Sequence, residues 1–523
     1  MSQEHQIYDI IIIGGGIYGA WSAREATLRG LKTLLVEQGD WGGATSQSSS
    51  KLLHGGLRYL EQFEFGLVRK SLKERDLLYE IAPHLVKPLR FMVPIYDNSR
   101  VGPFRMRLGL KLYDSLAGNG PCSKPYKKLS RSEVFEDYAW LKQGGFKSSL
   151  EYSDAQTDDA RFTYQVVQTA ESLGAHIKSY CKASIVHAMH EIKQVELYNL
   201  KNQTKLTVKS KSILMATGPW MDAQIGKNKQ AKENSRLTKG VHILLPDIGL
   251  RKALTLMSPE DGRVFFMIPW YHKTMVGTTD TDYQGSPENC TTTHEDIHYL
   301  LKSVNAFKES TPWKYEDVIS AFSGLRVLQS SNTDHPSQAS REWSLPEIRP
   351  GIFRSIGGKL TSAREDATFA LDQISRSMNF DTTLQHKNQP LLTYSPKKDY
   401  DTWKNEFFLE HPSIHVDILE NLSFRYGTKA TTILEQANTK LNDRIVEDLP
   451  FIMSEIKFIC QNENVVHATD IFRRRMPLIL LTPFSENLIH KILKLTSEVL
   501  SWDKETYNEE YSLLKEVWIA SLP

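Results

Sequence analysis

The stretch Ile10–Gly19, IIIIGGGIYG, decides the fold class of this chain. Its first four residues are β-branched and apolar, which is typical of a buried strand in a parallel sheet. Gly14, Gly16 and Gly19 follow at once with the spacing G-x-G-x-x-G. Apolar residues then recur over residues 20–28 and predict a helix. A strand, this glycine spacing and a helix together predict the first unit of a dinucleotide-binding fold.

The glycines and a later acid have separate tasks in nucleotide binding. Gly14 permits a tight turn, Gly16 lets the backbone approach a pyrophosphate, and Gly19 lets the helix pack closely on the strand. The helix N-terminus offers N–H groups and a positive dipole end to the phosphates. A second strand over residues 31–36 ends at Glu37, whose carboxylate is placed to hold both ribose hydroxyls of an adenosine. This unit alone does not distinguish FAD from NAD.

Two further observations favour FAD. No second fingerprint of this kind occurs in the chain, so a pyridine nucleotide has no separate site. Residues 212–218, SILMATG, read as an apolar strand that ends in Ala-Thr-Gly. In flavoproteins of the glucose-oxidase and D-amino-acid-oxidase superfamily, such a strand returns to the FAD domain, and the glycine, here Gly218, lets the backbone pass the cofactor.

The overall composition narrows the classes of protein. The chain has 523 residues, 40% hydrophobic and 24% charged, which suggests a folded protein of two or three domains. Its net charge of +2 gives no argument for a nucleic-acid partner. The four cysteines are widely spaced and form no CxxC, so we expect reduced thiols in a reducing compartment. We see no secretory signal and no apolar run near the roughly 18 residues of a spanning helix.

The chain resembles the family of FAD-dependent glycerol-3-phosphate dehydrogenases in a series of blocks that occur in order. The most diagnostic are GATSQSSSKLLHGGLRYLEQFEFGLV at 43–68 and VGTTDTDYQG at 276–285. Further matching blocks are IIIGGGIYGA at 11–20, APHL at 82–85, YSDAQTDDARF at 152–162, ATGPW at 216–220, KGVHIL at 239–244, FFMIPW from 265, SGLRVL at 323–328 and GGKLTSARE at 357–365. They cover most of residues 8–370, and the match weakens beyond about residue 390.

The resemblance implies an α/β fold with three parts. They are an FAD-binding Rossmann-like domain, a mostly antiparallel β-sheet substrate domain and a helical C-terminal cap domain. We assign the FAD domain to residues 1–85, 150–230 and 345–385, the substrate domain to residues 86–149 and 231–344, and the C-terminal domain to residues 390–523.

The implied reaction oxidises sn-glycerol 3-phosphate to dihydroxyacetone phosphate by hydride transfer to FAD, with a membrane quinone as the electron acceptor. One alternative is a glycerol-3-phosphate oxidase that uses dioxygen. Another is a flavin oxidoreductase of a different hydroxy or amino acid, in which the arginines bind a carboxylate. The sequence does not exclude either alternative.

This reaction needs cations for a phosphate dianion, a base, and donors for the developing oxyanion. The resemblance places Arg58, Arg326 and Arg341 near the substrate, where a planar guanidinium suits phosphate. It places Lys359 there too, and it gives Arg326 a catalytic role as well. His54 and His242 are the candidates for proton transfer, because imidazole titrates near working pH. For each histidine the alternative is to orient the flavin or to cap a turn.

The predicted FAD contacts come from the same blocks. Gly357-Gly358 would let the backbone approach the flavin, and residues 359–361 would open a helix whose N-terminus stabilises negative charge on the reduced ring. Val241, Val327 and Ser362-Ala363 depart from the family pattern and leave the details of substrate binding open. The predicted cofactor-binding residues are Gly14, Gly16, Gly19, Glu37, Thr45, Ser46, Gly218, Gly358, Lys359, Leu360 and Thr361.

Residues 294–298, HEDIH, match the zinc-protease pattern H-E-x-x-H. Thr293 is a good N-cap, and Asp296 falls three residues later, which predicts a capping box at a helix start. The apolar residues that follow continue the helical period. We therefore expect an ordinary helix here and no metal.

Residues 100–113, RVGPFRMRLGLKLY, mix cations with apolar residues and could form a basic amphipathic helix after Pro103. One hypothesis is that this helix docks on anionic lipid at the inner, cytoplasmic face of the cell membrane, where quinone is available. The alternative is a buried helix whose cations reach water. The resemblance favours membrane contact, and a homodimer is compatible with it.

Overall fold

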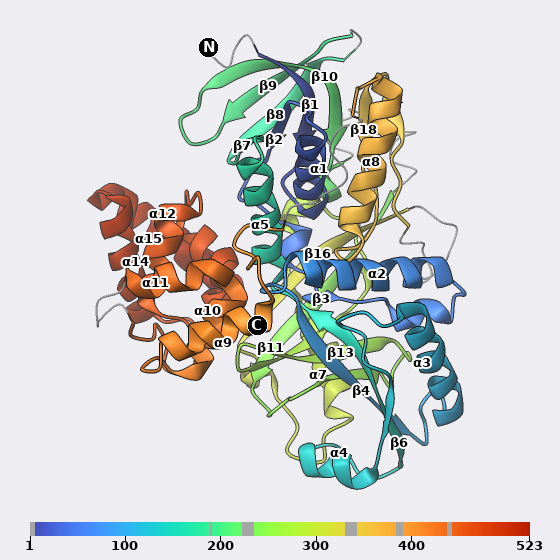
Figure 1. The fold of residues 1–523 in the computed structure, drawn as a ribbon. Coiled ribbons are helices and arrows are strands. Elements are labelled where there is room, and N and C mark those ends of the chain that lie inside the picture. The colour runs from blue at the N-terminus through green and yellow to red at the C-terminus, as the bar shows by residue number, and fades with distance from the viewer. Residues whose placement is uncertain (1–5, 189–190, 222–234, 330–341, 383–390, 437–441) are drawn as a thin grey trace.

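The structure is a computed structural model that describes residues 6–188, 191–221, 235–329, 342–382, 391–436 and 442–523. These residues form two large sheets, one above the other in Figure 1, and a group of C-terminal helices beside them. Within the described ranges, no helix has both the length and the apolar character needed to span a membrane.

The upper sheet carries the predicted dinucleotide-binding unit. Its main path runs β17-β18-β10-β1-β2-β7, and β8 and β9 continue it beyond β10. β1 pairs in parallel with β2 and with β10, so the strand that ends in Ala-Thr-Gly does return beside the first strand, as predicted. The strands are β1 Ile7–Ile13, β2 Thr33–Val36, β7 His176–Lys178, β8 Cys181–His187, β9 Lys193–Asn199, β10 Lys205–Met215, β17 Glu347–Arg349 and β18 Ile352–Arg354.

Helix α1, Ile17–Leu28, follows β1 through the glycine turn and packs against α5, Asp159–Ser172, and α8, Ala363–Met378. The four isoleucines at 10–13 in β1 are buried because helices and strands cover both faces of this sheet, whereas Ile7 at the start of the strand is exposed. The buried core beneath α1 thus holds the glycine turn in a fixed position.

The lower sheet is antiparallel apart from the pairing of β12 with β4 among its described strands. β13 and β14 form the predicted hairpin, and Tyr271 and His272 at its turn have φ of 45° and 56°, the left-handed values of a tight hairpin turn. The strands are β3 Leu52–Leu53, β4 Lys87–Tyr96, β5 Lys127–Leu129, β6 Phe146–Gln156, β11 Ser235–Pro246, β12 Ala253–Met257, β13 Val264–Trp270, β14 Lys273–Gly277, β15 Thr281–Asp282 and β16 Ser320–Gln329.

The chain passes between the two sheets several times. β6 belongs to the lower sheet, and α5 directly after it packs on the upper one. The predicted mixture of a partly parallel sheet, a mostly antiparallel sheet and a helical C-terminal part is confirmed. The exact domain boundaries stay a prediction.

Four helices accompany the lower sheet: α3 Pro103–Ala117 and α4 Arg131–Asp137 contact β6, α7 His294–Asn305 packs on β11 and β14, and α2 Phe65–Ile81 packs against α3. α7 begins at His294, and Thr293 and Asp296 form the predicted capping box. His294 bonds to the Tyr315 hydroxyl through Nδ1 at 2.6 Å. Among the described residues, no group of three or more His, Cys, Asp or Glu side chains is arranged to hold a metal ion.

The C-terminal helices share an apolar core with the lower sheet. They also contact α5 through buried ion pairs, including Arg161 with Glu463 and Arg425 with Asp158. The elements are α9 Tyr400–Glu410, α10 Val416–Tyr426, α11 Ala430–Glu435, α12 Met453–Asn462, the π-helical segment η9 Asp470–Arg475, α13 Leu478–Leu481, α14 Glu486–Leu500 and α15 Lys504–Ile519.

Candidate active site

A cavity of about 1070 Å³ extends from the glycine turn of the upper sheet to helix α3. Its volume is at the upper end of the range for cofactor and ligand sites. Gly19 lies outside the lining because it packs behind the turn, and Arg341 lies outside the described residues. The other predicted site residues line this cavity: Gly14, Gly16, Glu37, Thr45, Ser46, His54, Arg58, Gly218, His242, Arg326, Gly358, Lys359, Leu360 and Thr361.

The glycine turn has the geometry that its spacing predicts. Gly14 has φ of +109°, and a Cβ there would lie 2.4 Å from the Ala216 carbonyl oxygen at the end of β10. A Cβ on Gly19 would lie 1.8 Å from the Gly14 oxygen. Both positions therefore require glycine, the first for the turn and the second for close packing of helix on strand.

Glu37 lies at the end of β2, where it was predicted. Its carboxylate accepts hydrogen bonds from the backbone N–H groups of Gly15 at 2.6 Å and Gly39 at 2.8 Å. Burial raises the pKa of Glu37, and these two donors act against that shift. The acid is thus held between the glycine turn and the loop that follows β2.

The residues at this end of the cavity fit FAD. The backbone N–H of Ile17, in the first turn of α1, donates to Ser46 Oγ at 2.9 Å, so a hydroxyl already lies where phosphate is expected. A Cβ on Gly16 would meet no atom closer than this hydroxyl, at 3.2 Å, which leaves the backbone open to the cavity. Thr217 Oγ1, also in the lining, is buried with no hydrogen-bond partner among the described residues. Thr45 instead donates to the Leu325 oxygen and ties the two sheets together.

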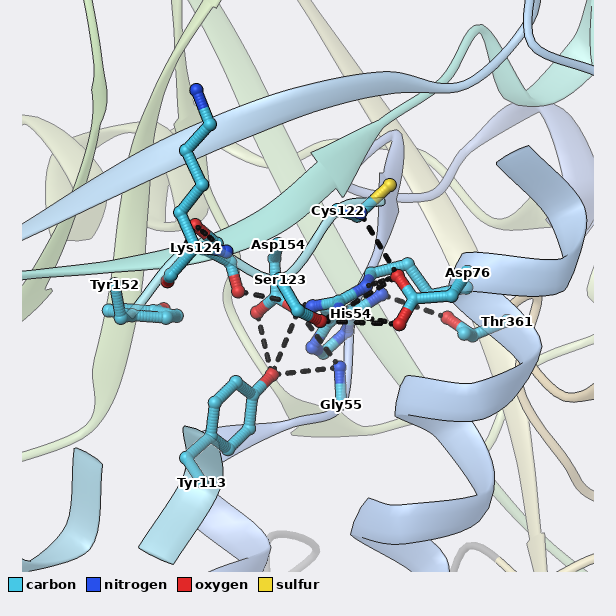
Figure 2. A network of polar contacts seen from close by, with 12 residues as sticks. His54, Gly55, Asp76, Tyr113, Cys122, Ser123, Lys124, Tyr152, Asp154 and Thr361 are labelled. Atoms are coloured by element: carbon cyan, nitrogen blue, oxygen red, sulfur yellow. Dashed lines mark hydrogen bonds and ion pairs between the residues drawn. The ribbon is translucent and has the colours of Figure 1, made fainter. Parts of the chain in front are cut away.

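His54 lies on a loop that a buried polar network fixes from behind, as Figure 2 shows. The Gly55 N–H donates to the Tyr113 hydroxyl at 2.9 Å and to Asp154 Oδ1 at 3.2 Å. Arg75 donates to the same Asp154 oxygen at 3.0 Å. A Cβ on Gly55 would lie 2.6 Å from the Tyr113 hydroxyl oxygen, so only glycine fits against this network. The packed loop leaves His54 half-buried in the cavity lining.

The carboxyl of Asp154 is the centre of this network. Burial raises its pKa to about 6, although Arg75 and the donors from Tyr113 and Gly55 favour the ionised form. The network joins α2, α3 and β6 behind one loop. Its buried, mutually bonded groups make the position of His54 depend on three separate elements.

A second loop, residues 357–361, also lines the cavity and contacts the His54 loop directly. The His54 backbone N–H donates to Thr361 Oγ1 at 3.1 Å. The hydroxyl of Tyr18, in α1, accepts from the Lys359 N–H at 2.9 Å, and a Cβ on Gly358 would lie 1.6 Å from that hydroxyl. α8 begins at Ala363, slightly later than predicted. The loop is therefore fixed to the glycine-motif helix on one side and to the His54 loop on the other.

His242, in β11, is buried and held by two contacts. Its Nε2 shares a hydrogen bond of 2.8 Å with Ser50 Oγ, and its ring stacks on Phe322 with 5.0 Å between centroids. Its Nδ1 has no hydrogen-bond partner within the described part of the chain. Burial, followed by the charges of Arg326 and Lys51, holds the pKa of His242 well below its usual range. The imidazole is therefore neutral at ordinary pH.

Arg326, in β16, is oriented by the GTTDTDY block. It donates to Asp280 Oδ1 at 3.1 Å and to Thr278 Oγ1 at 2.8 Å. A Cβ on Gly240 in the neighbouring strand would lie 2.2 Å from its Nη2, so any side chain there would displace the guanidinium from this position. Ser50 and Asp280 are the site residues that sequence reasoning missed. Each lies in one of the two most diagnostic sequence blocks, and that position could have indicated them as site residues.

Two further cations border the same space. Lys359 Nζ lies 3.7 Å from the centre of the Tyr59 ring, and the Arg58 guanidinium lies 5.4 Å from it. Together with Arg326 they line the cavity that the dinucleotide motif opens into. Fold and site thus define the class: a dinucleotide-dependent enzyme whose cavity can bind an anionic substrate beside its cofactor.

Comparisons with known proteins agree with this class. A sequence profile described as "FAD dependent oxidoreductase" matches residues 9–353, and one described as "C-terminal domain of alpha-glycerophosphate oxidase" matches residues 393–507. The chain is 34% identical over 484 residues to an aerobic glycerol-3-phosphate dehydrogenase of Staphylococcus aureus, with 90% of this chain and 86% of that protein covered. A protein of the same name from Staphylococcus haemolyticus is 32% identical over 487 residues, with 90% and 87% covered.

Solved structures share the fold. A glycerol-3-phosphate dehydrogenase of Bacillus halodurans, complexed with FAD, superposes with a TM-score of 0.80 at 24% identity and covers 100% of this chain and 96% of its own. An L-alpha-glycerophosphate oxidase of Mycoplasma pneumoniae with FAD bound gives 0.58 at 17% identity, covering 75% and 100%. The chain belongs to the FAD-dependent oxidoreductase family, in the group of the aerobic glycerol-3-phosphate dehydrogenases. FAD is its cofactor.

Proposed function

We propose that this enzyme oxidises sn-glycerol 3-phosphate to dihydroxyacetone phosphate and passes the electrons to a membrane quinone. The observation that carries the proposal is the grouping of Arg58, Arg326 and Lys359 with two histidines in the cavity of the dinucleotide motif. A phosphate dianion needs such cations, and an alcohol oxidation needs a proton acceptor. The names of the relatives agree with this substrate.

FAD, when bound, supplies the acceptor for the hydride that leaves C2 of the substrate. The protein's own groups bind, orient and deprotonate. Arg326, fixed by Asp280 and Thr278, holds the phosphate with Arg58 and Lys359, and we include Arg341 in this group. A histidine takes the proton of the C2 hydroxyl as the hydride leaves.

Anaerobic reduction of the bound flavin tests the substrate. We expect the visible flavin band of the purified protein to bleach when glycerol 3-phosphate is added without air, and not when glycine or D-alanine is added. Glycine is the informative control because glycine oxidases share this fold. Bleaching by an amino acid, with none by glycerol 3-phosphate, would reassign the arginines to carboxylate binding.

The same sample tests the electron acceptor. We expect a soluble quinone analogue to restore the flavin band much faster than dissolved oxygen does. Faster recovery in air, with hydrogen peroxide formed, would make the enzyme an oxidase, the activity that the name of the Mycoplasma pneumoniae protein states.

The membrane part of the proposal rests on an exposed apolar face beside the cavity. On α3, Phe104 is 79% exposed and Leu108 62%, and on the loop before α2 Phe63 is 78% exposed. Phe63, Leu108 and Leu112 also line the cavity, so this face continues into the site. Large apolar side chains exposed together indicate an interaction surface. An apolar acceptor such as quinone would reach the cavity along these apolar side chains.

The charges on α3 suit an anionic lipid surface. Arg105, Arg107 and Lys111 are exposed between the apolar residues, whereas Met106 and Leu110 face the core. The helix predicted after Pro103 is present, and this arrangement favours interfacial docking over a buried helix. We propose attachment to the inner face of the cell membrane, and include a homodimer in the proposal.

Vesicle flotation tests the docking. We expect Arg105→Glu/Arg107→Glu and Phe104→Ser/Leu108→Ser each to lower binding to phosphatidylglycerol vesicles at least tenfold, on the order expected for lost charge and apolar contacts. Matched controls are Lys494→Glu/Lys504→Glu and Leu409→Ser, whose side chains are exposed on the C-terminal helices. Equal losses in the control variants, or none in the α3 variants, would contradict this orientation.

A further inference from the structure

The carboxylate of Asp40 joins the cofactor end of the cavity to the C-terminal helices. Asp40 follows Glu37 on the loop after β2 and is buried. Arg475 Nη2 donates to Asp40 Oδ1 at 2.8 Å, and Arg475 Nη1 and Arg474 Nε both bond to Oδ2. Both arginines belong to η9. Burial acts to raise the pKa of Asp40, but the two guanidinium groups hold it below its usual value, so the carboxylate stays charged.

The same loop is tied on its other side to the glycine turn. The Gly42 N–H donates to the Gly15 oxygen at 3.0 Å, and the Gly15 N–H donates to Glu37 at 2.6 Å. A Cβ on Gly15 would lie 2.5 Å from the Trp41 ring. Residues 37–42 are therefore packed directly on the motif that receives the FAD phosphates.

Segment η9 is itself held firmly. Asp470 accepts from Arg474 at 2.7 Å and from the Tyr180 hydroxyl at 2.5 Å. The Arg475 guanidinium lies 4.0 Å from the centre of the Tyr164 ring on α5. The Tyr180 N–H, in the turn between β7 and β8, donates to the Gly39 oxygen at 3.0 Å, so this turn also holds the loop. A rigid support therefore faces Asp40.

We infer that the helical C-terminal region retains FAD, because Arg474 and Arg475 hold Asp40 and thereby position the loop that presents Glu37 to the adenosine. The reason is geometric. Glu37 can accept both ribose hydroxyls only if residues 37–42 keep their place on the glycine turn. Without the two arginines, Asp40 is a buried charge with no compensation, and the loop must move to hydrate it. Arg474 and Arg475 are positioning residues, since neither lines the cavity.

The rate of FAD release from the full-length holoenzyme tests this inference. We expect Asp40→Asn and Arg475→Met each to release FAD at least tenfold faster than wild type, followed by the rise of free-flavin fluorescence after dilution. Arg474→Gln should give a smaller increase, because Arg475 still holds Asp40; this variant also serves if Arg475→Met does not fold. In the apoprotein, hydrogen exchange of the backbone amides of residues 37–42 should also be faster in these variants, with the smaller increase again in Arg474→Gln.

A second ion pair at the same interface provides the control. Arg161 bonds to both oxygens of Glu463, at 2.7 and 2.8 Å, and neither side chain bonds to residues 37–42. We expect Arg161→Met/Glu463→Gln to lower the melting temperature of the full chain but to leave FAD release within about twofold of wild type. If FAD release is accelerated equally in this control variant, the effect reflects a general loss of stability and the inference is overturned. It is also overturned if Asp40→Asn releases FAD at the wild-type rate. No substrate enters these measurements, so they are independent of the proposed function.

Discussion

Replacing Arg326 by methionine, with Asp280 changed to asparagine in the same chain, should lower kcat/KM for glycerol 3-phosphate by about 100- to 1000-fold. Arg326 is the cation whose orientation is best defined, by Asp280 at 3.1 Å and Thr278 at 2.8 Å. Losing a charge-assisted contact to a buried phosphate costs about 2–5 kcal/mol. The double change also neutralises Asp280, so that no buried carboxylate loses the charge of Arg326, a loss that would destabilise the fold for another reason.

Glycerol as a second substrate separates the two roles expected of Arg326. Glycerol has the reacting alcohol and lacks the phosphate, so a phosphate-binding Arg326 should matter little for it. We therefore expect the variant to oxidise glycerol within about threefold of wild type, with the loss for glycerol 3-phosphate mostly in KM. Arg251→Met, an exposed arginine, is the control. Equal losses with both substrates would place Arg326 at the C2 oxygen instead.

Asp280→Asn alone should give the same pattern in weaker form. The guanidinium remains but loses the partner that orients it, so we expect kcat/KM for glycerol 3-phosphate to fall about tenfold and the value for glycerol to stay constant. A loss confined to glycerol 3-phosphate would show that Asp280 acts by orienting Arg326.

The cofactor-binding end of the site could be predicted from residues that are adjacent in the sequence. β1, the glycine turn and α1 are continuous in the chain, and a Cβ at Gly14 or Gly19 collides with atoms of the same turn or of the adjoining strand. Such requirements appear in the residue types themselves. The cations and histidines of the site were predicted from the resemblance, because they lie in the matching blocks. Those among the described residues do line one cavity in the structure.

Partners that meet only in the folded chain could not be read in this way. Ser50 and His242 lie 192 positions apart, and Asp40 and Arg475 lie 435 apart. The serine run and the three arginines of DIFRRR look like ordinary polar surface in the sequence. Their roles follow from burial in the folded chain, because a buried hydroxyl or charge must bond to another polar group and is held in place by it.

Exchanging His54 for asparagine should slow anaerobic reduction of the flavin by glycerol 3-phosphate about 100- to 10,000-fold, the usual effect of losing a general base. His54 is the better candidate of the two histidines. It is half-buried at the cavity wall, whereas His242 is 1% exposed. His242 also has a pKa well below its usual range, through burial and the charges of Arg326 and Lys51, and is a weak proton acceptor.

His242→Asn should therefore slow reduction only about tenfold, and its pH profile is the decisive readout. His242 is neutral above its depressed pKa, and protonating it needs a pH well below 6.5. Any change of rate with pH between about 6 and 8 must then come from another group, and it should persist in His242→Asn.

Ser50→Ala is the matched variant, because it frees Nε2 without removing the ring. A pH dependence in that range that disappears in His242→Asn and survives in His54→Asn would make His242 the base, with Ser50 as the hydroxyl through which its proton passes.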